Sequence, residues 1–143
     1  MEGSLSLHRA RIVWEGGRED LRAHRVEVAE QVIAASCAAE WGGDPAKADP
    51  EQMFVASLSA CHMLWFLALA RGRRLRVRSY EDPAVGTLDG GRITRVELAP
   101  EVRFEDDPGP EVREELHRAA HERCFLANSV SCPVEVIAPE ADR

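Results

Sequence analysis

The segment from Met53 to Ala70 reads MFVASLSACHMLWFLALA and contains no charged residue. A membrane-spanning helix needs roughly 20 predominantly apolar residues. Four polar or weakly polar side chains interrupt this run: Ser57, Ser59, Cys61 and His62. No second apolar run of this kind follows, and a helix that is apolar all round is also typical of the centre of a domain or of a dimer. We therefore expect a buried central helix and no membrane span.

The residues around this run predict where the helix begins and ends. Asp49 is a good N-cap, Pro50 suits the first helical position, and Gln52 can reach back to complete a capping box. A polar loop punctuated by glycine and proline, residues 41–49, precedes the helix, and the basic cluster 71–76 follows it. Both helix boundaries therefore carry signals of their own.

Segments with period-two patterning predict strands on both sides of the central helix. The expected strands are residues 5–15, 24–29, 31–36, 76–88, 92–104 and 133–138, and a second helix is expected over residues 110–124. Asp89-Gly90-Gly91 should join the two longest strands into a hairpin. This order predicts an α+β fold of antiparallel sheets with a buried central helix, not a doubly wound parallel sheet. With 143 residues, one domain should cover the whole chain, residues 1–143.

Charge and cysteine content narrow the class of protein. The formal net charge is −7 and the pI is near 5.3, which argues against nucleic acid as the main partner. The N-terminal residues contain no apolar run of the length that a secretory signal needs, so we expect a cytoplasmic protein. In a reducing compartment structural disulfides are disfavoured. Metal binding, catalysis or packing must then explain four thiols: Cys37, Cys61, Cys124 and Cys132.

Two blocks of sequence carry a family resemblance. DPEQMFVASLSAC, residues 49–61, together with HERCFLANSV around Cys124, resembles the OsmC/Ohr family of organic hydroperoxide reductases. Four residues of the first block stand in the family's register: Pro50, Glu51, Ala60 and Cys61. Phe125 stands where many members have proline, so the chain resembles a divergent OsmC-like branch. The resemblance implies the OsmC-like fold and an intertwined homodimer with two active sites at its interface.

The resemblance also implies roles for individual residues. Cys61 would be the peroxidatic thiol, Cys124 the resolving thiol, and Glu51 the carboxylate that orients an arginine. That arginine follows a glycine turn near the N-terminus, which Gly16-Gly17-Arg18 matches best. Two other arginines lie nearby as rivals: Arg22 and Arg25.

The implied activity is that of a thiol peroxidase, an antioxidant oxidoreductase of the stress response. The Cys61 thiolate would attack the distal oxygen of an organic hydroperoxide and release an alcohol. The resulting sulfenic acid would condense with Cys124 to a disulfide, which an external dithiol, of lipoyl type or a small thiol, would reduce. This chemistry requires no metal, flavin or haem, so no cofactor is expected.

Physical arguments apply to these roles separately. The pKa of a free thiol is roughly 8.5, and a nearby permanent positive charge such as an arginine favours the reactive thiolate. Glu51 and Cys61 are separated by ten residues, or roughly 15 Å along one helix. One arginine can contact both side chains only if the helix bends or if Glu51 comes from a second subunit. The apolarity of the helix favours the second arrangement.

Other interpretations remain open. The chain can be a dimeric binding or redox-sensing module without catalysis. A zinc site can be built from four residues near the second helix, although they lack a compact CxxC pair: His117, His121, Cys124 and Cys132. His62 beside Cys61 is a poor general base, since adjacent helical residues point about 100° apart. We expect Cys37 to be a buried packing residue, and Cys132 is a rival candidate for the resolving thiol.

Overall fold

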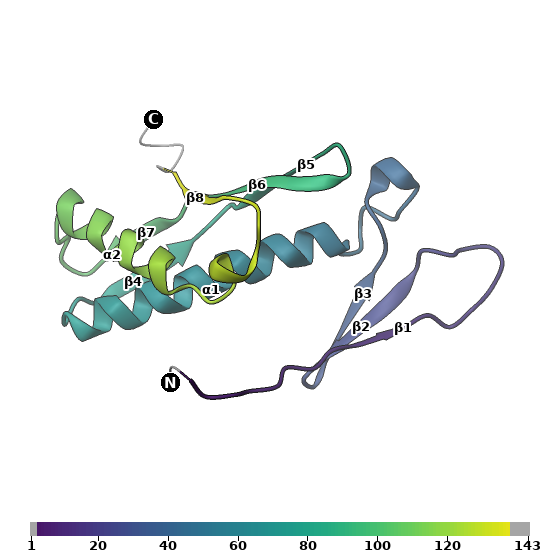
Figure 1. Cartoon of the computed structure of the whole chain (residues 1–143), viewed down its shortest axis with the longest axis horizontal. Helices are drawn as coiled ribbons and strands as arrows, with labels where there is room; N and C mark the ends of the chain where they lie inside the picture. The colour runs from purple at the N-terminus through teal and green to yellow at the C-terminus, as the bar shows by residue number, and fades with distance from the viewer. Residues whose placement is uncertain (1–2, 138–143) are drawn as a thin grey trace. The chain divides into compact units, whose positions relative to one another are not determined.

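The structure of the protein, a computed structural model, describes residues 3–137 (Figure 1). The chain divides into two compact units, Met1–Met53 and Phe54–Arg143. Three strands precede a long helix, and four strands, a second helix and a last strand follow it. The α+β fold predicted from the order of elements is therefore confirmed.

The N-terminal unit is a three-stranded antiparallel sheet. Its strands are β1 (Arg11–Val13), β2 (His24–Val28) and β3 (Gln31–Ala35), in that spatial order. β2 and β3 lie within the predicted ranges, but β1 is much shorter than the predicted strand over residues 5–15. A strand needs a partner for its backbone groups, and β2 pairs only with residues 11–13 of this segment.

The loop between β3 and the long helix is tightly held. It contains the short 3₁₀ helix η1 (Ala39–Trp41). Ser36 N–H donates to the Ala48 carbonyl at 2.9 Å, and Ala48 N–H donates to the Ala34 carbonyl at 3.3 Å. At its end the predicted capping box is present. Gln52 N–H donates to the Asp49 carboxylate at 2.7 Å, and Asp49 N–H donates to the Gln52 side chain at 2.9 Å. The helix therefore begins where the sequence predicts.

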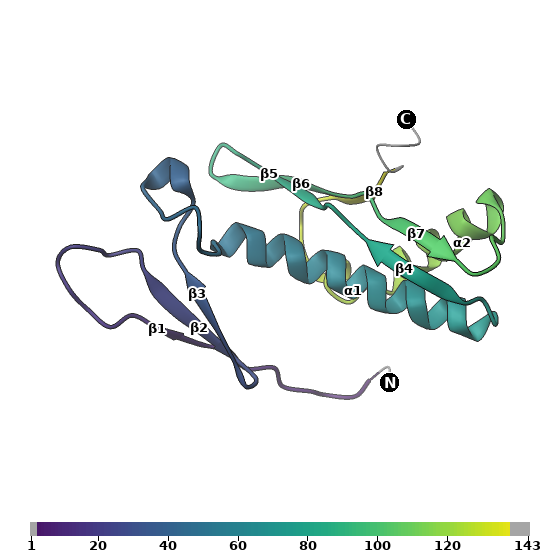
Figure 2. The same ribbon diagram turned by 180° about the vertical axis from the view of Figure 1, so that it is seen from behind.

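The C-terminal unit contains two small sheets laid along the central helix α1 (Pro50–Gly72), as Figures 1 and 2 show. One sheet pairs β4 (Val77–Glu81) with β7 (Glu101–Phe104). The other has the order β5-β6-β8, with bounds Val85–Asp89, Arg92–Leu98 and Val134–Val136. The second helix is α2 (Pro110–Arg123), and a 3₁₀ turn, η2 (Ala127–Ser129), follows it.

The two long strands predicted after α1 are each broken in two. The predicted range 76–88 contains β4 and β5, and the range 92–104 contains β6 and β7. Pro83 and Pro100 lie at the breaks, where the missing proline N–H cannot join a strand ladder. The predicted hairpin at Gly90 and Gly91 is present between β5 and β6, and both glycines have positive φ.

The last strand pairs in a direction that the sequence did not predict. β8 runs parallel to β6, with Val134 opposite Val96, so this sheet is mixed and not wholly antiparallel. β8 is shorter than the predicted strand over residues 133–138, of which residue 138 lies outside the described residues.

One face of α1 forms the core of the C-terminal unit. Leu58, His62, Phe66 and Ala70, spaced four residues apart, are its buried residues. Leu58 lies in a cluster with residues of β6 and the β8 region, and Phe66 in a second cluster with residues of β7 and α2. Four-residue spacing aligns side chains along one side of a helix, so a single stripe of α1 serves both clusters.

The opposite face of α1 is apolar and exposed in the single chain. Leu64 is 62% exposed, and Ala56, Ala60 and Ala68 on the same side are exposed as well. The single chain therefore covers one face of α1, and burial of the opposite face in a dimer stays a prediction. By its length and composition alone, α1 could cross a membrane, but the core helix of a soluble protein meets the same criteria. Its packed face on strands and α2 matches a core helix.

Candidate active site

The structure brings Cys61 and Cys124 together. Cys61 lies midway along α1 and is half-buried, whereas Cys124 follows the last residue of α2 and is 1% exposed. Burial raises the pKa of the Cys124 thiol, the Ala127 N–H opposes that rise, and the neighbouring Cys61 thiol adds to it. Both thiols are free. Two reduced thiols from two helices are therefore neighbours, 63 positions apart in the sequence.

The segment after α2 holds Cys124 in place. Ala127 N–H points at the Cys124 sulfur at 3.4 Å, and Asn128 N–H donates to the Cys124 carbonyl at 3.1 Å. The Asn128 side chain also donates to the Glu122 carbonyl at 3.2 Å. The segment FLANSV thus turns back around the thiol that precedes it. This turn gives a structural reason for the second sequence block.

An aromatic pair lies beside the two thiols, with one ring on α1 and the other in the segment after α2. Trp65 follows Cys61 by one helical turn, and Phe125 directly follows Cys124. Their rings pack edge to face with centroids 5.4 Å apart, and the Arg123 guanidinium lies 5.7 Å from the Trp65 ring. Phe125 is 62% exposed. The sequence analysis did not predict this pair, although the spacing of Cys61 and Trp65 carried the signal.

His62 has a partner of its own on α2. Its Nε2 lies 3.0 Å from His117 Nδ1, the rings are nearly parallel, and the His117 ring packs on Phe66 with centroids 4.4 Å apart. Burial lowers the pKa of His62 to about 4, and burial likewise lowers the pKa of His117 to about 4. His62 is thus a buried, neutral member of a histidine pair.

The predicted alternative of a zinc site gains no support. Cys132 lies in the apolar cluster around Leu58, and Cys124 lies beside Cys61. Among residues 3–137 no three histidine, cysteine or acidic side chains are grouped as a metal would require. Zinc ligands must converge within about 2.3 Å of one centre. Cys132 is explained by packing in this cluster.

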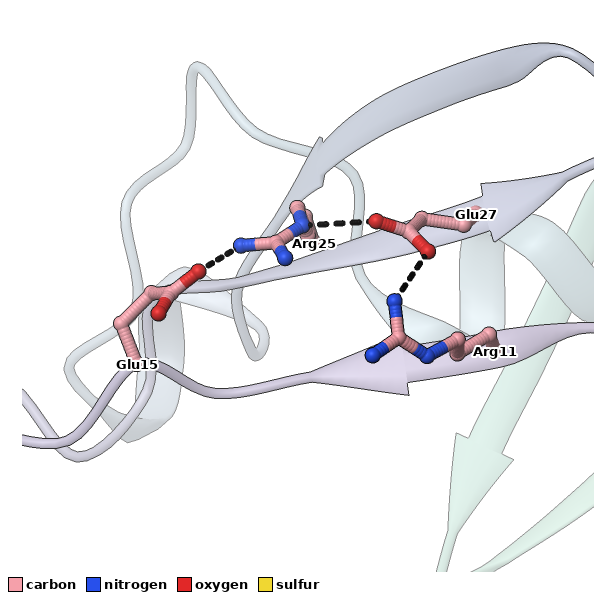
Figure 3. A network of polar contacts seen from close by, with 4 residues as sticks. All are labelled: Arg11, Glu15, Arg25 and Glu27. Carbon is pink, nitrogen blue, oxygen red and sulfur yellow. Dashed lines mark hydrogen bonds and ion pairs between the residues drawn. The ribbon is translucent and has the colours of Figure 1, made fainter.

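The candidate arginines lie in the N-terminal unit, and Figure 3 shows one of them in a network. Arg25 bridges two carboxylates, those of Glu15 and Glu27, with its Nε 2.9 Å from Glu27. Arg11 binds the other oxygen of Glu27 at 2.8 Å. The two guanidiniums lower the pKa of Glu27, with the hydrogen bond from Arg25 the larger cause. Arg25 is therefore committed to the sheet.

Arg22 has a hydrogen-bond partner for its side chain, whereas Arg18 has none among the described residues. The Nε of Arg22 donates to the Trp41 carbonyl at 2.9 Å, and its guanidinium packs against Gly42. Arg18 follows Gly16 and Gly17, both with positive φ, in the β1–β2 loop. Within residues 3–137 it forms no ion pair or side-chain hydrogen bond. Glu51 lies in the first turn of α1. The roles of Arg18 and Glu51 toward Cys61 stay predictions.

Comparisons with known proteins agree with the fold. A family described as OsmC-like protein matches residues 42–138. An OsmC-like protein of unknown function from Vibrio cholerae is 36% identical, with a TM-score of 0.84 over 94% of this chain and 99% of that chain. No curated protein matches.

Two solved structures of lower identity share the fold. An organic hydroperoxide resistance protein OsmC from Legionella pneumophila is 19% identical, with a TM-score of 0.67 over 93% of this chain and 98% of that chain. An organic hydroperoxide resistance protein from Elizabethkingia anophelis is also 19% identical, with a TM-score of 0.66 over 96% and 99% of the two chains. At this identity the likeness concerns the fold.

Proposed function

Because this chain belongs to the OsmC-like protein family, we propose that it is a thiol peroxidase that reduces organic hydroperoxides to alcohols. One observation carries the proposal: Cys61 and Cys124, both free, come from two helices and lie next to each other. The names of two solved proteins of the same fold support the substrate class, because both are organic hydroperoxide resistance proteins.

The reaction balances with these two thiols and an external dithiol. The Cys61 thiolate attacks the distal oxygen, the O–O bond breaks, and the alkoxide takes a proton and leaves as the alcohol. The Cys124 sulfur then attacks the Cys61 sulfenic acid, forming the disulfide and releasing water. A dithiol of lipoyl type or a small thiol supplies two electrons and two protons to restore both thiols. Such a cycle suits a reducing compartment such as the cytoplasm.

The different burial of the two thiols supports this order of steps. Cys61 is half-buried and can meet a substrate, whereas Cys124 is buried and its raised pKa keeps it protonated. Only the thiolate attacks a peroxide well, so a protonated Cys124 avoids direct oxidation. Cys124 then reacts only with the sulfenic acid formed beside it.

The aromatic pair supports an organic substrate. Trp65, one turn after Cys61, and Phe125, next to Cys124, pack together edge to face. Moving an alkyl group from water onto an apolar surface lowers the free energy by about 25 cal/mol per Å² of buried surface. We therefore assign to these rings the contact with the organic part of the peroxide.

The arginine of this site is proposed to be Arg18. Arg25 is held by Glu15 and Glu27, and Arg22 is held by the Trp41 carbonyl, so Arg18 is the candidate without a partner among the described residues. α1 is continuous from Pro50 to Gly72, which favours a Glu51 contributed by a second subunit. The exposed apolar face of α1 supports the homodimer that this arrangement needs.

Serine variants of the thiols test the proposal. Cys61→Ser should abolish consumption of cumene hydroperoxide with a dithiol reductant, because the attacking sulfur is lost. Cys124→Ser should consume one equivalent and then stop, because no resolving sulfur remains. Peptide mapping of the oxidised parent should find Cys61 joined to Cys124.

Cys132→Ser is the matched control. It should keep the turnover of the parent, because Cys132 packs in the cluster around Leu58 and takes no part in the proposed cycle. Full activity of Cys61→Ser would rule out the enzyme and leave a non-catalytic binding or sensing module. A Cys61–Cys132 disulfide in the oxidised parent would assign resolution to the other thiol.

A further inference from the structure

A hollow of the C-terminal unit lies away from the two thiols. It has a volume of about 500 Å³ and is lined by α2, β7, β8 and the residues that flank these strands. Neither Cys61 nor Cys124 lines it. Small-molecule sites in proteins commonly measure roughly 300–1,000 Å³. The hollow is therefore large enough to take a ligand of its own.

One wall of this hollow is apolar and formed by strands. Val102, Val134 and Val136 face it together with Ile137. Val102 and Val134 are also buried residues of the two core clusters, so this wall is continuous with the packed interior. Such a wall favours the apolar part of a ligand.

The other wall is α2, and it presents nitrogen donors. His117, His121 and Arg118 line the hollow, and Arg118 and His121 form no side-chain hydrogen bond or ion pair within residues 3–137. Arg113 also lines it but is fixed by Asp107, with two contacts of 3.0 and 3.1 Å. Glu114 is the one carboxylate among the lining residues of the hollow.

The histidine pair fixes the direction of one donor. His117 lines the hollow, and its Nδ1 is occupied by His62 Nε2 at 3.0 Å, so Nε2 is the ring nitrogen that remains for a ligand. His62 is 1% exposed, and its Nδ1 is buried with no partner. When His62 Nε2 donates to His117 Nδ1, His117 Nε2 carries the proton and can donate to a ligand.

We propose that this hollow binds a small amphipathic carboxylate, with the carboxylate on His117 and Arg118 and the hydrocarbon chain against the valine wall. A carboxylate accepts charge-assisted hydrogen bonds from a guanidinium and from a ring N–H, which a neutral alcohol cannot match. The site is separate from the thiols, so binding does not depend on the proposed peroxidase activity.

Isothermal titration calorimetry of the reduced parent protein at pH 7 tests the site with three probes. Sodium octanoate has both parts of the ligand, 1-octanol lacks the charge, and sodium acetate lacks the chain. Octanoate should bind at least about tenfold more tightly than either of the others, because only it uses both walls. Equal binding of octanol and octanoate, or no binding of octanoate, would overturn the proposal.

Two variants with opposite expected effects test whether octanoate binds in this hollow. Arg118→Gln should weaken octanoate binding about three- to tenfold, and Glu114→Gln should tighten it by a similar or smaller factor, because it removes a repelling charge. A misfolded variant cannot bind octanoate more tightly than the parent, so tighter binding by Glu114→Gln still tests the site if Arg118→Gln is unstable. Arg92→Gln, on β6 outside the hollow, is the control for loss of one arginine and should not change binding.

The outcome is distinguishable from that of the peroxidase assays. Cys61→Ser should bind octanoate as tightly as the parent, because Cys61 does not line the hollow. Unchanged binding in both Arg118→Gln and Glu114→Gln would show that octanoate binds elsewhere and would overturn the assignment.

Discussion

The arginines of the β1–β2 region show how partners decide which charge is available. Arg25 has two carboxylates and Arg22 a carbonyl, whereas Arg18 has neither among the described residues. A guanidinium that is already held by partners in its own sheet or loop is not free to turn toward a thiolate. Arg18 has no such contact among the described residues, which makes it the residue to test.

Arg18→Ala should slow the alkylation of Cys61 at neutral pH by about tenfold or more, since a close positive charge that favours the reactive thiolate is lost. Arg22→Ala should change this rate little, and Glu51→Gln should slow it less than Arg18→Ala does, because it releases the arginine without deleting it. The rate of iodoacetamide alkylation at Cys61 measures all three variants. A large effect of Arg22→Ala with none of Arg18→Ala would contradict the assignment.

The histidine pair predicts a pH dependence of stability. In the folded protein the pKa of His62 and that of His117 are both about 4, below the ordinary value of 6.5, mainly because of burial. Between these values the unfolded chain binds more protons than the folded chain. The stabilisation is therefore complete above pH 6.5 and is lost as the pH falls toward 4, by up to about 1.4 kcal/mol per pH unit for each proton.

Urea denaturation at several pH values between 5 and 7 checks this expectation. The free energy of unfolding should fall with pH in the parent, and the slope should be smaller in His117→Gln, which cannot take up that proton. His8→Gln, at an exposed position, should keep the parent slope. Equal slopes in the parent and in His117→Gln would mean that the pair is not held neutral.

Residue-level prediction from sequence succeeded where a motif existed and missed long-range contacts. Cys61 and Cys124 were found through the family resemblance, and their proximity agrees with it. The pairing of His62 with His117 was missed, because the two residues are 55 positions apart and belong to no motif. Sequence periodicity places each on its helix but does not say which helix faces which.

At the scale of elements, the loop between β3 and α1 depends on a close backbone approach. A Cβ at Gly43 would lie 1.8 Å from the Cys37 carbonyl oxygen. That oxygen belongs to the backbone and cannot move aside as a side chain can. The loop therefore requires glycine at this position for reasons of space, not of φ.

Gly43→Ala should lower the free energy of unfolding by about 1–3 kcal/mol, because the loop must shift to admit the methyl group. Gly72→Ala, at the end of α1, meets no atom within 4 Å and should be neutral or slightly stabilising. Urea denaturation followed by circular dichroism compares the two variants. Equal midpoints would show that the loop yields without cost.

The strands after α1 show which element boundaries the sequence carried. Pro83 and Pro100 mark the breaks that divide both long strands. The sequence prediction followed the period-two pattern instead and therefore continued each strand through its proline. The parallel pairing of β8 with β6 had no local signal. Strand pairing between distant segments is set by the packing of the whole unit, and a single sequence shows only local patterns.

At the scale of the whole molecule, the exposed face of α1 predicts a homodimer. Leu64, Ala60 and Ala68 leave an apolar stripe without cover in the single chain. Light scattering at micromolar concentration should give twice the mass of 15.9 kDa. Leu64→Glu should shift the protein toward the monomer, because a charge on this stripe cannot be buried cheaply.

Val85→Glu is the control for this measurement, since Val85 is similarly exposed but lies on β5. It should leave the mass unchanged. A parent protein that stays monomeric would remove both the interface and the role of Glu51 across it.

The parallel strand β8 has a consequence for synthesis on the ribosome. The cluster around Leu58 includes Cys132 and Val134, which leave the ribosome after every other buried residue of the cluster. Because α1 and β6 emerge earlier, their apolar side chains stay uncovered until residues 132–134 are made and this cluster can close. A nascent chain that stops before β8 keeps that surface open to other chains, so premature termination should produce aggregates and not a smaller folded protein.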